Sequence, residues 1–253
     1  MPANTKFPVC EQPSDPEISV YRYMNLAKLV NLITTSRLYL INLNYLEDSA
    51  EGTFDPSTRA AMIADYETRR TEQEAFLKSR GIENFPSNPV ENLERSLKSG
   101  CYVNCWCIQQ YESEALWRIY GGEYGVAIRT TYQQLALALP SHCMMGKVKY
   151  YDPSTEKIPL ENFLNIAMHK RHFFKHEHEC RIFHFDGTGM GETPVGYDKN
   201  SPRPIAISAQ VDLKIAKLEV IPSPLAPPWY FDTVAKLLSA ISSPCTIAES
   251  VMK

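Results

Sequence analysis

The sequence has no long apolar run and almost no excess of charge of one sign. A membrane-spanning helix needs about 20 consecutive, mostly apolar residues, and the 253-residue sequence contains no such run. The first residues, MPANTKFPVCEQPSDPEI, lack the charged and then apolar pattern of a secretory signal. A formal charge of -3 predicts no broad surface for nucleic acid. We therefore expect a cytoplasmic protein that has no membrane partner and carries no strong nucleic-acid signature.

Several motifs that carry familiar chemistry are also missing. The seven cysteines include no Cys-x-x-Cys pair, so we expect free thiols that pack as small hydrophobic side chains. A Gly-x-Ser-x-Gly elbow and a Walker loop are absent, which disfavours hydrolases and nucleotide triphosphatases of those types. The run GTGMGE at 187–192 resembles a phosphate-binding loop, but no helix start follows it. Its glycines more simply predict turns within a surface loop at 186–204.

The sequence does contain interleaved helical and strand-like segments with irregular connections. This pattern favours an α+β fold, a single domain at 18–253 that follows an irregular tail at 1–17. Its central sheet is expected to be mixed or antiparallel, with flanking helices and a helical insertion at about 57–89. Asn25 and Thr131 are placed to cap helices. Strands are predicted at 18–24, 37–43, 101–108, 146–151, 205–213, 216–224 and 245–250, and a late helix at 229–241.

The run HKRHFFKHEHECRIFHF at 169–185 holds the most chemistry. We predict a helix at 159–174 that leads into a strand. His169, His172 and His176 would share one face of that helix if it continued, and zinc accepts such ligands. The neighbouring lysines and arginine oppose a cation, and basic residues are common in the last turn of a helix. No metal is therefore favoured.

In the strand that follows, successive side chains alternate between two faces. Cys180 and Ile182 are predicted to enter the core, while Glu177, Glu179 and Arg181 share the other face. An exposed ion pair between Glu179 and Arg181 is the ordinary alternative. Phenylalanines farther along this face favour partial cover, which perturbs pKa values and suits acid or base chemistry. Glu179 and Glu177 are therefore the candidate catalytic residues.

The order of motifs along the chain resembles a known family. YRYM, RLYLINLNYLEDSAEGTF, CWC, LWRIYGGEYGVAI and KHEHECRIF follow the order and type of the bacterial domain of unknown function 2971 family, from residue 19 onward. The chain departs from it at 46–49, which read Leu-Glu-Asp-Ser where that family usually has Phe-Asn-Asp-Pro, and at Cys107, where it often has Ser. The family brings no settled activity.

A looser resemblance, to ADP-ribosyltransferases, bears on function. Arg22 in YRY, the CWC strand and the Glu-x-Glu pair at 177 and 179 match the order of roles in those enzymes. The resemblance implies that NAD is the substrate, with Arg22 on its pyrophosphate or ribose. It places Glu179 on the 2′-hydroxyl of the nicotinamide ribose and Glu177 near the acceptor nucleophile. The departure is Asn104-Cys105-Trp106-Cys107, which is not the Ser-Thr-Ser strand of those enzymes.

The implied chemistry is physically coherent. Cleavage of the nicotinamide bond builds positive charge on the ribose, which a carboxylate stabilises, and arginine grips a pyrophosphate with two hydrogen bonds. Tyr21 and Tyr23 flank the arginine of YRY and join the candidate cofactor-binding residues. Trp106, Trp117 and Tyr120 are candidates for an aromatic wall against nicotinamide or adenine, although the spacing of Trp117 and Tyr120 is also typical of core residues.

We therefore expect an enzyme that uses NAD or another nucleotide, of ADP-ribosyltransferase or NAD glycohydrolase type. It would transfer ADP-ribose to a macromolecular acceptor or hydrolyse the cofactor, as a toxin or a phage-defence component. The alternative is a non-catalytic nucleotide- or ligand-binding module in which Arg22, Trp117 and Arg181 line the pocket. A second alternative is a metal-dependent phosphodiesterase or nuclease that uses Glu177, Glu179 and the histidines.

Overall fold

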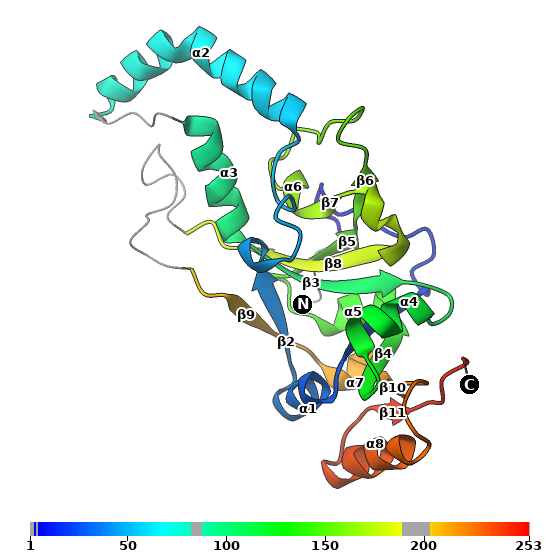
Figure 1. Cartoon of the computed structure of the whole chain (residues 1–253). Coiled ribbons are helices and arrows are strands. Elements are labelled where there is room, and N and C mark those ends of the chain that lie inside the picture. The colour runs from blue at the N-terminus through cyan, green and yellow to red at the C-terminus, as the bar shows by residue number, and fades with distance from the viewer. Residues whose placement is uncertain (1–2, 4, 82–87, 189–202, 253) are drawn as a thin grey trace.

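The fold is built on one large sheet, seen in a computed structural model that describes residues 3, 5–81, 88–188 and 203–252 (Figure 1). All but one of its strand pairs are antiparallel, and β10 and β11 run parallel. The described residues form a nine-stranded mixed sheet, which confirms the predicted α+β class. Its strands are β1 (Ser19–Asn25), β2 (Arg37–Asn42), β3 (Cys101–Ile108), β4 (Gly125–Thr131), β5 (Met144–Lys147), β8 (Glu179–Phe185), β9 (Ala206–Gln210), β10 (Glu219–Pro222) and β11 (Thr246–Ile247).

The helices and shorter turns connect and cover these strands (Figure 1). A small second sheet pairs β6 (Lys149–Tyr151) with β7 (His169–Arg171) in parallel. Helical turns of 3-10 type occur at η1 (Leu43–Tyr45) and η3 (His172–Glu177), and a π-helical turn at η2 (Trp117–Gly121). The α-helices are α1 (Leu26–Thr35), α2 (Pro56–Ser79), α3 (Pro89–Gly100), α4 (Glu114–Leu116), α5 (Tyr132–Ala138), α6 (Asn165–Met168), α7 (Leu213–Ala216) and α8 (Trp229–Ala240).

Strand β3 is the branch point of the sheet. One of its edges pairs with β8 over seven residue pairs, and the other edge pairs with β2 near its beginning and with β1 at its end. The middle of that second edge lies between β1 and β2, where side chains supply the hydrogen bonds. The Asn104 amide donates to the Tyr39 carbonyl at 2.8 Å, and Arg22 donates to the Cys105 carbonyl at 3.2 Å.

The two faces of the sheet bury different residues. One face packs against α1, α5, α7 and α8 in the largest apolar cluster, to which Trp106 and Ile182 belong. The other face carries two smaller apolar clusters, one around Phe183 and one around Trp117. Charged side chains of β8 lie on this second face, because they alternate with the core residues of the same strand.

Helix boundaries follow local capping. The Asn25 side chain accepts a hydrogen bond from Lys28 N at the start of α1, and the Thr131 side chain accepts one from Gln134 N at the start of α5. Both predicted caps are confirmed. Helix α1 ends where Ser36 adopts a left-handed conformation, with φ 52° and ψ 40°, a common way to terminate a helix.

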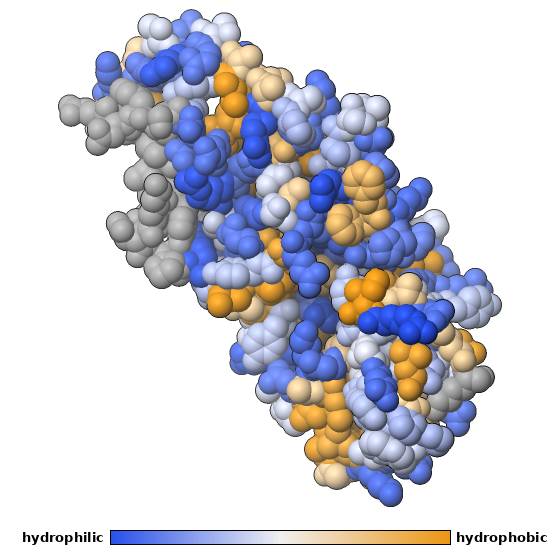
Figure 2. All heavy atoms as spheres, viewed as in Figure 1, coloured by the Kyte–Doolittle hydropathy of each residue, from blue (hydrophilic) through white to orange (hydrophobic). Residues whose placement is uncertain are grey.

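Helix α2 occupies most of the segment at about 57–89 that was predicted as a helical insertion, α3 follows this segment, and α2 extends away from the sheet (Figure 1). Asp55 caps α2; burial raises its pKa, but hydrogen bonds from Thr58, Ser57 and Ile158 outweigh burial and lower it to about 2. An ion pair of 2.7 Å between Arg59 and Glu94 joins the two helices. Figure 2 shows the same face of the molecule. Hydrophilic side chains are widespread on it, and hydrophobic ones gather in several separate patches.

The prediction of a helix at 159–174 is wrong. Only Asn165–Met168 form α6, and the chain then extends as β7 beside β6. The residues at 165–170 are all buried, and a surface helix cannot bury six consecutive side chains. Tertiary packing therefore overrides the local helical pattern. Most of the surface loop predicted at 186–204, with its GTGMGE run, lies outside the described residues.

Candidate functional site

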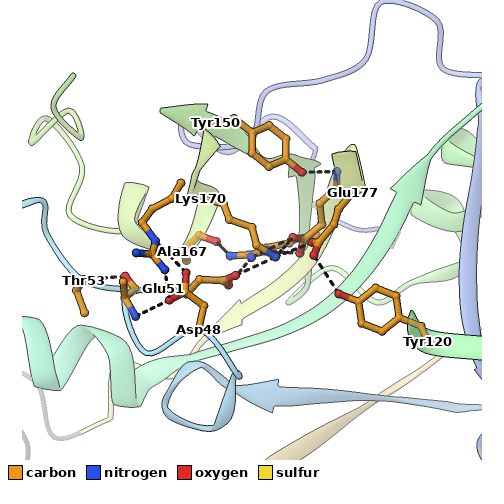
Figure 3. Close-up of polar contacts among 12 residues, drawn as sticks. Asp48, Glu51, Thr53, Tyr120, Tyr150, Ala167, Lys170 and Glu177 are labelled. Atoms are coloured by element: carbon orange, nitrogen blue, oxygen red, sulfur yellow. Dashed lines mark hydrogen bonds and ion pairs between the residues drawn. The ribbon is translucent and has the colours of Figure 1, made fainter. Parts of the chain in front are cut away.

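Five charged side chains meet on the second face of the sheet and form what we call the charge cluster (Figure 3). Two come from β8, one each from β7 and the end of η3, and one from the loop before α2. All are buried, with no more than 8% of any residue exposed. Buried charges require partners, and these five satisfy one another. They are Glu51, Lys170, Glu177, Glu179 and Arg181.

Three carboxylates converge on the ammonium group of Lys170 (Figure 3). The Lys170 Nζ lies 2.9 Å from Glu51 Oε1, 2.6 Å from Glu177 Oε2 and 3.2 Å from Glu179 Oε2. The ring of Phe174 lies 4.8 Å from the same nitrogen. The cation at the centre of this acidic site is therefore the lysine itself.

Arg181 holds the other side of the cluster. Its Nε donates to Glu179 Oε1 at 2.6 Å, and its two terminal nitrogens donate to Glu51 Oε2 at 2.6 Å and to the Ala167 carbonyl at 2.7 Å. The side chain is fully buried. A planar guanidinium with three fixed partners holds both carboxylates rigidly.

The electrostatic balance keeps Glu179 ionised. Burial raises the pKa of this carboxyl, but the charges of Arg181 and Lys170 and the hydrogen bond from Arg181 outweigh burial and lower it to about 2. Burial likewise opposes the charge of Lys170, and Glu179 and Glu51 overcome it, so that its pKa is raised. The cluster therefore contains ionised groups of both signs at neutral pH.

Two cysteines of β3 face the cluster from the neighbouring strand. Cys105 pairs in register with Arg181, and Cys107 with Glu179. Burial first and the Glu179 charge second raise the pKa of both thiols, that of Cys107 to about 12. These cysteines are free and protonated at neutral pH, in agreement with the predicted free thiols.

Glu177 lies where the cluster approaches the surface. Its Oε1 accepts a hydrogen bond of 3.0 Å from the hydroxyl of Tyr120 (Figure 3). Tyr120 is 45% exposed, and burial, followed by the Glu177 charge, raises the pKa of its hydroxyl. On the other side the Tyr150 hydroxyl accepts a hydrogen bond from Glu179 N at 2.8 Å. A ligand that approaches from solvent would therefore meet Tyr120 and Glu177 first.

Glu177 and Glu179 were predicted to lie together on one face of a strand. They do lie together, but the predicted reason is wrong. Glu177 does not belong to the strand; it ends η3, and His178 then adopts a left-handed conformation with φ 43°. Glu177 and Glu179 meet because both contact Lys170. The expected partial exposure of Glu179 and Arg181 is also wrong, since they are 3% and 0% exposed.

Four other predicted cofactor-binding residues bond or pack outside the charge cluster. Trp106 points into the main core on the opposite face of β3 and donates from its ring nitrogen to Asn104 at 2.8 Å. Trp117 is fully buried, and its ring nitrogen donates to Glu112 at 2.9 Å. Tyr21 and Tyr23 pack in the same apolar cluster as Trp117. Among the aromatic candidates, Tyr120 is the one that bonds to the charge cluster.

Arg22 lies near the cluster but bonds to the backbone. Its guanidinium fills the gap between β1 and β3 and donates to the Cys105 carbonyl. Burial lowers its pKa, and nearby groups, Glu179 among them, act in the opposite direction. The charge of Glu179 thus acts on Arg22, but Trp106 packs in the main core on the other side of the sheet, so the three do not surround one cleft.

The histidines do not share a helical face, because that helix does not form. His169 is buried, with Nδ1 2.7 Å from the Asn165 carbonyl oxygen, His172 is partly buried and His176 is exposed. Across residues 3–252, apart from the undescribed gaps, no group of three or more His, Cys, Asp and Glu side chains is arranged to hold a metal ion.

Sequence reasoning missed Glu51 and Lys170 as members of the site. Glu51 belongs to a loop, LEDSAEGTF, that also supplies Asp48, whose carboxylate forms an ion pair of 2.7 Å with Arg171. Several carboxylates in one short loop indicate that the loop contacts basic side chains from other parts of the chain. For Lys170 no local signal existed. It lies near the end of the predicted helix at 159–174, where a basic residue is expected to be exposed.

The chain matches no protein-family model, no curated protein and no solved structure. Within the described residues no helix combines the length and apolar character needed to cross a membrane. The resemblances noted from the motifs therefore remain expectations, and a functional argument has to start from the geometry of the charge cluster.

Proposed function

We propose that the charge cluster is the active site of an enzyme that uses NAD or a related nucleotide, of ADP-ribosyltransferase or NAD glycohydrolase type. The observation that carries the proposal is the convergence of Glu51, Glu177 and Glu179 on one buried ammonium group, with Glu177 bonded to the half-exposed Tyr120.

The cost of this arrangement supports a functional role. Removing several charges from water is expensive, and apolar residues of similar volume often stabilise a fold as well or better. Strongly perturbed, coupled ionisable groups are found preferentially at functional sites. Glu179, whose pKa is lowered to about 2 although burial opposes its charge, is such a group.

The geometry suits stabilisation of positive charge. A nicotinamide ribose becomes cationic as its glycosidic bond breaks, and fixed carboxylates lower the free energy of that state without reorganising. Glu177, which Tyr120 connects to the surface, would contact the nucleotide. Glu179 would act as a positioning residue that fixes Lys170 and Arg181.

Release of nicotinamide from NAD in the presence of cell lysate tests the proposal. We expect Glu177→Gln to reduce the rate by about 100-fold, a typical loss for a group that acts on the transition state. Glu114→Gln is the matched control, because Glu114 forms an exposed ion pair with Arg118 on the surface. The proposal would be refuted if the wild-type protein released nicotinamide no faster than the lysate alone. It would also be refuted if Glu177→Gln released nicotinamide as fast as the wild type.

One observation favours a non-catalytic ligand-binding module instead. Both oxygens of Glu179 and all three nitrogens of Arg181 already have protein partners. In that case the cluster would only hold the fold around a binding surface near Tyr120. Calorimetry against a panel of nucleotides would then show binding, with the ligand recovered chemically unchanged.

A further inference from the structure

A separate pocket lies where β1, β4, β10 and β11 approach α7. Its volume is about 440 Å³, within the range of small-molecule sites, about 300–1,000 Å³. Four charged residues line it: Arg129, Lys214, Lys217 and Glu219. None of them belongs to the charge cluster, so this pocket requires its own explanation.

The pocket carries more positive than negative charge. Arg129 Nε donates to Glu219 Oε2 at 2.5 Å, and this ion pair neutralises the one carboxylate among the described lining residues. Lys214 and Lys217 are exposed, and within the described ranges neither forms an ion pair. Two ammonium groups thus remain uncompensated on a chain whose formal net charge is -3.

Neutral donors complete the wall. Ser19 and Gln134 line the pocket, and a serine hydroxyl and a glutamine amide group can each donate a hydrogen bond. No aromatic side chain occurs among the described lining residues, so a stacked base has no support there. Cations combined with hydroxyl and amide donors suit the oxygens of a phosphate group.

Lys217 closes α7 and also lines the pocket. This residue ends α7 in the left-handed conformation, with φ 46° and ψ 52°. Glycine adopts that conformation without the steric conflict that a β-carbon introduces, and it is the usual residue there. Ser36 ends α1 in the same conformation, so the backbone marks the end of α7, and the part that Lys217 plays rests on its place in the pocket wall.

We propose that this pocket binds the phosphate group of a small phosphorylated ligand, with Lys214 and Lys217 as its cationic contacts. The proposal is independent of the function proposed for the charge cluster. In the register of the sheet, Arg129 opposes Tyr21, Tyr21 opposes Cys107 and Cys107 opposes Glu179. Arg129 and Glu179 are therefore three strand spacings apart, roughly 14 Å.

Calorimetry on the full chain at low ionic strength tests this, with inorganic phosphate, ribose 5-phosphate and ribose as probes. We expect saturable binding of at least one phosphate compound and none of ribose. The double variant Lys214→Gln/Lys217→Gln should weaken that binding by about tenfold or more, since loss of two charged contacts is expected to exceed 1.4 kcal/mol. Tighter binding of ribose 5-phosphate would identify a sugar phosphate, and equal binding would identify free phosphate.

The double variant Lys28→Gln/Lys236→Gln is the matched control, because it removes the same charge from exposed lysines of α1 and α8. Thermal melts should show that both variants fold, since all four lysines are exposed. Equal weakening in the two double variants would mean diffuse electrostatic attraction and would overturn the proposal. Failure of the wild-type chain to bind either phosphate compound in a saturable manner would overturn it as well.

Discussion

Alternate residues of one strand, β8, meet opposite environments. Cys180 and Ile182 pack in the main apolar core, and Glu179 and Arg181 lie in the charge cluster, yet all four are at most 3% exposed. Burial of the apolar pair is favourable by itself, because it removes apolar surface from water. Burial of the charged pair is tolerated only because each group has a partner. The same degree of burial therefore makes one face depend on how well its side chains fill the core and the other depend on the partners of its charges.

Removal of Arg181 should produce the largest effect. Arg181→Met leaves Glu51 and Glu179 without one of the two cations that each of them contacts, and breaking a buried ion network from one side costs about 3–5 kcal/mol. Arg118→Met is the matched control, because Arg118 forms an exposed ion pair and should lose less than about 1 kcal/mol. Urea denaturation of both variants measures the difference, and similar losses in the two would show that the cluster is not a coupled network.

Truncation of a side chain on the apolar face should lower the free energy of unfolding by about as much as the loss of Arg181, or slightly less. Ile182→Ala deletes buried methyl groups and should lower the free energy of unfolding by about 2–5 kcal/mol, depending on how far the core relaxes. Ile215→Ala, at a residue that is 43% exposed, is the control and should change little. If Ile182→Ala were as mild as the control, the assignment of this face to the core would fail.

Acid should destabilise the charged face selectively. The folded-state pKa of Glu179 is about 2, below its unfolded value of about 4.3, so its contribution is present above the unfolded pKa. That contribution, roughly 3 kcal/mol, is lost as the pH falls from about 5 towards 2. Urea denaturation of the wild type at a series of pH values measures the slope.

The variant Glu179→Gln should show a shallower loss of stability over the same pH range, because its side chain does not titrate. Asp55 also has a pKa of about 2, so part of the slope should persist in the variant. Identical slopes in the wild type and in Glu179→Gln would contradict the ionised state assigned to Glu179.

The smallest effect is expected at the border between cluster and solvent. Tyr120→Phe removes the hydrogen bond to Glu177 and should cost about 0.5–1.5 kcal/mol, the usual range for one hydrogen bond. Tyr111→Phe, at a residue that is 64% exposed, is the control. Thermal melts compare the two. If Tyr120→Phe slowed nicotinamide release by far more than its loss of stability explains, Tyr120 would belong to the active site. If Tyr120→Phe and Tyr111→Phe melted at the same temperature, the hydrogen bond to Glu177 would contribute nothing to stability.

Sequence reasoning succeeded where neighbours in the chain decide the structure. The caps Asn25 and Thr131 and the core side chains Cys180 and Ile182 were predictable, because capping and strand alternation act within four residues. The helix predicted at 159–174 was not found, because β6 offers β7 a partner and the residues at 165–170 are all buried. Local propensity is a weak prior against such tertiary contacts.

By itself the sequence determined most of the strands and helices, the caps Asn25 and Thr131, and the alternation that separates Glu179 from Ile182. Only the tertiary structure decided what each charge meets. The bond between Glu51 and Arg181 spans 130 positions, and Lys170 reaches its carboxylates from a strand that forms only against β6. Such contacts depend on strand register and on the closure of long loops. Those are properties of the whole fold, and the spacing of residues along the chain contains little record of them.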